Sequence, residues 1–128
     1  MSAHRTKLAI LLWSATPAQP ALCATPFVHA ALAAALDCEV EIHFSGSASR
    51  LLVAGVAEHL YAAPDSGTSI YAFMQEAARL GVRFLACAMA QQAHIQEGEA
   101  TISEFTGSAS ATDFVLRVLD PEWATLVF

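Results

Sequence analysis

The chain has 128 residues, of which 55% are hydrophobic and 14% are charged, and its formal net charge is -6. This length suits one domain with its own hydrophobic core, and the scattered lysines and arginines form no basic stripe that could follow phosphates, which excludes nucleic acid as an expected partner. The most apolar run, residues 8–13, is far too short to span a bilayer, which needs about 20 residues.

The first predicted element is a strand over residues 7–15, where the sequence reads KLAILLWSA. A continuous apolar run of this kind is typical of a strand buried on both faces of a parallel sheet. Arg5 and Lys7 give the start of the chain a superficial likeness to a signal peptide. Because the apolar stretch is short and serves better as a first strand, we expect a cytoplasmic protein.

Apolar residues at helical spacing predict a helix over 27–36. Thr25 and Pro26 are suited to its N-cap and first position, or the helix begins near Pro20 and bends at Pro26. Residues 38–44 read CEVEIHF and alternate between apolar and polar side chains. That alternation predicts a strand with one wet face, near an edge of the sheet.

Two more helices are expected in the middle of the chain. After a turn at 46–49, leucines and a valine on one face predict a helix over 51–61. A further helix over 70–80 has Ser69 as its N-cap, and Gly81 closes it at the expected position.

The remaining elements follow in the same alternation. Residues 82–86, VRFLA, predict a second strongly buried strand, followed by a short helix over 88–94. Residues 100–105 alternate weakly and suggest a short strand before a turn at Gly107. The last two elements are a helix begun by a capping-box-like pair, Ser110 and Asp113, and an apolar strand over 124–128.

Strands that alternate with helices predict parallel pairing and right-handed crossovers. The expected fold is one α/β domain over 1–128, with a doubly wound, mainly parallel sheet of four to five strands and helices on both faces. We expect the two uniformly apolar strands, 7–15 and 82–86, to be adjacent and central, with 38–44 at or near an edge.

Of the three cysteines, Cys87 is the candidate for chemistry. It directly follows a buried strand and precedes a helix, so it is expected at the carboxyl edge of the sheet, where open α/β sheets bind ligands and where backbone N–H groups favour a thiolate. The alternative is a buried, inert thiol. Cys23 is expected to pack against the sheet, although it could approach Cys87, and Cys38 is expected to be structural, at the opposite edge.

The segment VRFLACAMA, residues 82–90, resembles the active-site segment of the DsrE/DsrF-like family, which includes the TusD-like sulfur-relay proteins. The opening run over 7–17, the strand over 38–44 and the final ATLVF fit the same family pattern. The resemblance implies a flavodoxin-like fold and a cytoplasmic homo-oligomer, a trimer or a hexamer. It also implies that Cys87 accepts sulfane sulfur as a persulfide from a donor protein and hands it to an acceptor protein.

One departure from that pattern is that no second cysteine lies near the C-terminus. The low charge and high apolar content independently favour an oligomer. Two other hypotheses remain open: a non-catalytic binding module with an inert Cys87, and a small-molecule or metal-binding protein. Because no GxGxxG, Walker or HExxH motif is present, we expect no cofactor and no metal.

Among the histidines, His94 follows Cys87 by seven residues, about 10 Å along a helix, which is too far for direct base chemistry. His29 and His59 are expected on helix faces. The hydroxyl-rich loops 45–49 and 106–110 could bind an anion, but ordinary helix capping is the expected role of both.

Overall fold

The computed structural model describes residues 6–128, and its centre is one five-stranded, fully parallel sheet with the strand order β4-β3-β2-β1-β5. The strands are β1 (Lys7–Leu12), β2 (Glu39–Phe44), β3 (Arg83–Ala86), β4 (Phe105–Ser108) and β5 (Trp123–Val127). The α-helices are α1 (Ala24–Ala35), α2 (Ile70–Arg79), α3 (Ala88–His94) and α4 (Ala111–Leu119). The predicted fold class, a parallel α/β sheet with helices on both faces, is confirmed.

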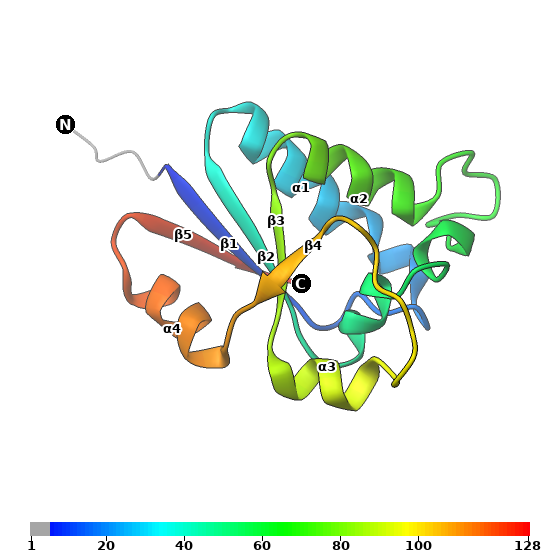
Figure 1. The fold of residues 1–128 in the computed structure, drawn as a ribbon. Coiled ribbons are helices and arrows are strands. Elements are labelled where there is room, and N and C mark those ends of the chain that lie inside the picture. The colour runs from blue at the N-terminus through cyan, green and yellow to red at the C-terminus, as the bar shows by residue number, and fades with distance from the viewer. Residues whose placement is uncertain (1–5) are drawn as a thin grey trace.

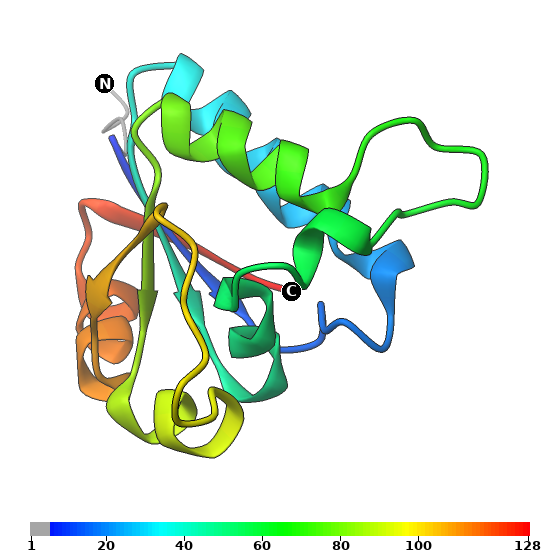
Figure 2. The same cartoon turned by 45° about the vertical axis from the view of Figure 1, so that its right-hand side comes forward.

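The direction of chain winding explains how the helices are distributed. From β1 to β4 each new strand is added on the same side, so right-handed crossovers place the connecting helices on one face. The chain then returns across the sheet to pair β5 with β1, which puts α4 on the other face, as Figures 1 and 2 show. The connections that follow the adjacent strands β3 and β4 therefore leave on opposite faces.

The main core lies under α1 and α2. Its centre is a cluster of three buried rings, those of Phe27, Phe44 and Phe84, with centroids 5.4 to 6.1 Å apart. The core on the other face is small and contains Ala9, Phe114 and Trp123. Among residues 6–128, no helix has both the length and the apolar character needed to cross a bilayer.

The predicted strand order is wrong in one respect. The strand β2 is central and separates β1 from β3, so the two uniformly apolar strands are not adjacent. The polar face that indicated an edge is covered: Glu41 and His43 are both buried, 0% and 5% exposed. Side-chain hydrogen bonds satisfy both residues beneath α4, so alternation of polar residues here does not mark a wet surface.

The predicted helix over 51–61 is also wrong. The chain forms two short 3-10 helices instead, η2 (Gly46–Leu52) and η3 (Ala57–His59), and the predicted turn at 46–49 belongs to the first. Gly55 separates them with φ of 91°, a left-handed conformation that favours glycine and ends any regular helix. The next helix, α2, begins as predicted, because the Ser69 hydroxyl accepts a hydrogen bond from the backbone N–H of Ala72.

The start of the first helix and the bounds of one strand differ clearly from prediction. The first helix begins at Ala24, before Pro26, and its N-cap residue is Cys23 rather than Thr25. The strand expected over 100–105 is β4, which begins at Phe105 and includes the expected turn residue Gly107.

The chain before β4 pairs elsewhere, since Thr101 forms an antiparallel bridge with Val53, and the pairing of β4 with β3 is irregular at Thr106. Its hydroxyl exchanges two hydrogen bonds with the backbone of Phe84, where the β3–β4 register shifts. The Thr106 hydroxyl thus takes the place of a backbone group in the hydrogen bonding between β3 and β4.

Candidate active site around Cys87

Cys87 follows β3 directly and is the N-cap of α3. Its Sγ accepts a hydrogen bond from the backbone N–H of Ala90, with 3.3 Å between sulfur and nitrogen. The residue is half-buried, and the helix it begins is short. The structure therefore places Cys87 at the carboxyl end of the sheet, as predicted, with its sulfur against the first turn of α3.

This position coincides with the point where the sheet changes its winding. The connection after β3 leaves on one face and the connection after β4 leaves on the other, and such switch points form the ligand crevice of open α/β sheets. Two hollows meet at Cys87. One is a small apolar cavity of about 70 Å³, and the other is an open groove of about 450 Å³ that includes the exposed Met89.

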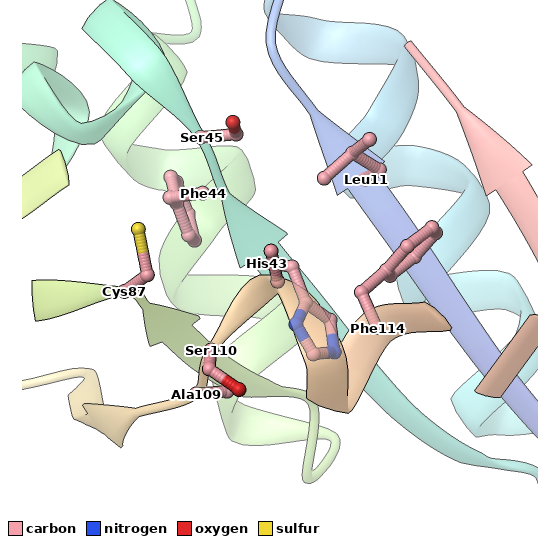
Figure 3. Close-up of a pocket in the computed structure, with 9 residues that line it drawn as sticks. Leu11, His43, Phe44, Ser45, Cys87, Ala109, Ser110 and Phe114 are labelled. Carbon is pink, nitrogen blue, oxygen red and sulfur yellow. The ribbon is translucent and has the colours of Figure 1, made fainter. Parts of the chain in front are cut away.

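The small cavity lies between the sheet and the start of α4, and Figure 3 shows the side chains around it. Besides Cys87 it is lined by strand residues Leu11, His43, Phe44 and Ser45 and by residues of the β4–α4 segment, Ala109, Ser110, Ala111 and Phe114. One water molecule needs about 10–15 Å³ of such space, so the cavity admits a few small atoms and no large ligand.

Glu41 lies on β2 beside the cavity and is the common acceptor of its polar contacts. Its carboxylate is buried and accepts hydrogen bonds from Arg83 of β3 at 2.7 Å and from Arg117 of α4 at 2.8 Å. The Arg117 guanidinium also stacks over the Trp123 ring, 4.4 Å from its centroid. These contacts attach α4 to the face of the sheet that has the smaller core.

Burial by itself raises the pKa of Glu41, but the hydrogen bonds from His43 and Arg117 and the charge of the Arg117 guanidinium outweigh it. The net result is a pKa of about 2, against the ordinary 4.5. The carboxylate is therefore ionised at neutral pH, deep inside the fold.

His43 is the residue of the cavity that sequence reasoning missed. Its Nε2 lies 2.9 Å from Oε1 of Glu41, and its ring meets the edge of Phe114 with centroids 5.2 Å apart. The signal in the sequence was the spacing Glu-x-His at the end of a strand, which puts both side chains on one face. From the sequence that face is predicted to be exposed to solvent, so the pattern alone does not indicate a buried Glu–His pair.

The other two cysteines lie apart from this cavity. Cys23 belongs to the main core, where its Sγ donates to the carbonyl oxygens of Thr16 and Gln19, and burial raises its pKa to about 11. Cys38 precedes β2 and is therefore at the amino end of the sheet, opposite Cys87. The expectation that Cys23 packs against the sheet is confirmed.

The predicted helix capping is confirmed for the loop 106–110 but not for 45–49, where Ser45, the N-cap of η2, makes no side-chain cap hydrogen bond. The Ser110 hydroxyl accepts from the backbone N–H of Asp113 in a capping box that begins α4, and the Ser49 hydroxyl bonds to a backbone carbonyl. His94 ends α3, at the far end of the helix from Cys87. Within residues 6–128, no group of three or more His, Cys, Asp or Glu side chains is arranged to hold a metal ion.

Comparison with known proteins gives no match, either among protein-family models or among curated protein sequences.

Proposed function

We propose that this protein is a sulfur carrier of the DsrE/DsrF-like, TusD-like kind. In this proposal Cys87 accepts one sulfane sulfur from a donor protein and passes it to an acceptor protein in the cytoplasm. The observation that carries the proposal is the position of Cys87. It lies at the carboxyl end of β3, where the connections after β3 and β4 leave on opposite faces of the sheet, and it lines both a small cavity and an open groove. The resemblance of VRFLACAMA to the active-site segment of that family supports it.

The chemistry needs only a thiol and room for one further sulfur atom. The Cys87 thiolate attacks the outer sulfur of a donor persulfide, R–S–SH; a new S–S bond forms between Cys87 Sγ and that sulfur as the S–S bond of the donor breaks. The net reaction turns Cys87–SH and R–S–SH into Cys87–S–SH and R–SH, with no external oxidant. A cavity of about 70 Å³ suits the outer sulfur, and the groove beside Met89 suits the partner's chain.

Sulfur loading is the direct test. After incubation with glutathione persulfide, we expect intact-protein mass spectrometry to show one added sulfur atom on the wild type and none on Cys87→Ser. Cys38→Ser is the matched control, since it removes another partly exposed thiol, and it should load like the wild type. Equal loading of Cys87→Ser and wild type would contradict the carrier function and favour a non-catalytic binding module with an inert Cys87.

We propose further that the carrier is a homo-oligomer, a trimer or a hexamer. Apolar side chains are exposed along α4 and the edge strand β5, including Leu119 at 73% and Val127 at 59%. Several exposed apolar side chains on neighbouring elements are typical of surfaces that contact other proteins. Light scattering at micromolar concentration should give a mass above that of one 13.5 kDa chain, and a monomer mass would contradict the proposal.

A further inference from the structure

The side chain of His43 is 6% exposed and lines the cavity that it shares with Cys87. Its Nε2 is occupied by Glu41, whereas its Nδ1 has no hydrogen-bond partner among residues 6–128. Every fully buried side-chain nitrogen or oxygen in that range does have a partner. Nδ1 is therefore not fully buried, and Figure 3 shows one ring nitrogen on the side of Ser110, another residue that lines the cavity.

The hydrogen bond to Glu41 decides which nitrogen of His43 carries the hydrogen. An ionised carboxylate can only accept, so Nε2 donates its N–H to Oε1. In the neutral imidazole, Nδ1 then presents its lone pair to the cavity. The two arginines that bind the same carboxylate fix the orientation of the whole group.

The register of the sheet places His43 close to Cys87 without direct contact. His43 pairs with Leu85, and Cys87 follows two residues later, just beyond the end of β3, so that both residues line the same cavity. The sulfur does not point at the imidazole in Figure 3. Between the two side chains there is space for a water molecule or for an incoming sulfur atom.

On the basis of the sulfur-carrier function, we propose that His43 is the proton acceptor and donor of the transfer, with Glu41 as its positioning residue. Nδ1 takes the proton of the Cys87 thiol through one water, and Sγ attacks the outer sulfur of the donor persulfide. The electron pair of the broken S–S bond stays on the donor's inner sulfur. The protonated Nδ1 returns its proton to that sulfur, so the donor leaves as a thiol and the imidazole is neutral again.

The charged groups around His43 come from three elements. Glu41 lies beside it on β2, Arg83 reaches the same carboxylate from β3, and Asp113 and Arg117 face it from α4. Arg83 also pairs with Glu39 of β2. Replacing His43 keeps all of these groups and Cys87, so a pH dependence of transfer that disappears with the imidazole is assigned to His43 itself.

The test measures the initial rate of sulfur loading from glutathione persulfide across a pH series, by intact-protein mass. We expect His43→Asn to load about 100-fold more slowly than the wild type and to lose the inflection in the pH profile. It should still reach the wild-type extent of loading, because Cys87 is intact. His59→Asn, in which an exposed histidine outside the cavity is replaced, should keep the wild-type rate and profile.

Two failures are distinguishable in this design. If the wild type loads no sulfur on Cys87, the carrier function is wrong. If the wild type loads and His43→Asn matches its rate and pH profile, the role of His43 is wrong while the carrier function stands.

A measurement on the wild type keeps the proposal testable if His43→Asn does not fold. Histidine ¹⁵N NMR should show hydrogen on Nε2 of His43 and none on Nδ1, and the Nδ1 signal should shift when Cys87 carries sulfur. The opposite tautomer, or an Nδ1 signal that does not respond to loading, would overturn the proposal.

Discussion

Replacing Glu41 with glutamine is expected to lower the free energy of unfolding by about 3 kcal/mol at neutral pH, because breaking a buried ion pair on one side leaves its partners uncompensated. The amide has nearly the shape of the carboxylate but carries no charge. Oε1 accepts from His43 and Arg117, and Oε2 accepts from Arg83. Whichever way the amide is turned, its NH₂ group meets a donor, so at least one of these hydrogen bonds is lost.

The pH dependence of the stability difference between wild type and Glu41→Gln shows how much of it is due to the charge of the carboxylate. The pKa of Glu41 is lowered in the folded state to about 2, against 4.5 ordinarily, so its contribution to stability is fully present above about pH 4.5. It is lost as the pH falls toward 2, and a shift of that size corresponds to about 3 kcal/mol. Urea unfolding of the wild type and Glu41→Gln should therefore show a stability gap that narrows below pH 4.5 and nearly closes near pH 2.

Glu76 provides the control, since it pairs with Arg79 on the exposed surface of α2. Glu76→Gln should leave the urea midpoint almost unchanged, because exposed ion pairs contribute little. A wild type and Glu41→Gln of equal stability at pH 7 would show that the buried network does not hold α4 to the sheet.

The same network explains why the sequence predicts the fold class but not the strand order. Continuous apolar runs such as 7–12 and 83–86 are buried for a local reason, the hydrophobicity of their own side chains. The burial of β2 depends on partners distant in sequence: Glu41 is satisfied by Arg117, 76 residues later. The pattern of residues 38–44 carries no information about that arginine, so from the sequence alone the polar face of this strand is predicted to be exposed to solvent.

The candidate site divides in the same way. Cys87 could be predicted because a buried strand and the start of a helix meet at that residue in the sequence itself. The place of His43 in the same cavity depends on β2 lying between β1 and β3, which the expected strand order excluded. Strand neighbours decide which side chains share a carboxyl edge, so an error in strand order becomes an error in the composition of the site.

Replacing Phe84 with alanine is expected to cost about 4 kcal/mol of unfolding free energy. Its ring is fully buried and lies 5.8 Å from the ring of Phe27 and 5.4 Å from that of Phe44, so truncation removes the middle of the aromatic cluster. Its backbone bonds to Thr106 are unaffected by the change, so the loss belongs to the ring. Urea unfolding should show a lower midpoint with an unchanged slope, since the variant still folds to the same compact state.

Leu36→Ala is the matched truncation on the surface, because Leu36 is 78% exposed just after α1. Its cost should stay within about 0.5 kcal/mol, as for most surface substitutions. Native domains are stable by only about 5–15 kcal/mol, so the Phe84 variant should also lose a large share of its thermal stability. If Phe84→Ala costs no more than Leu36→Ala, the three rings do not form the centre of the core, and the packing of α1 against β2 and β3 is wrong.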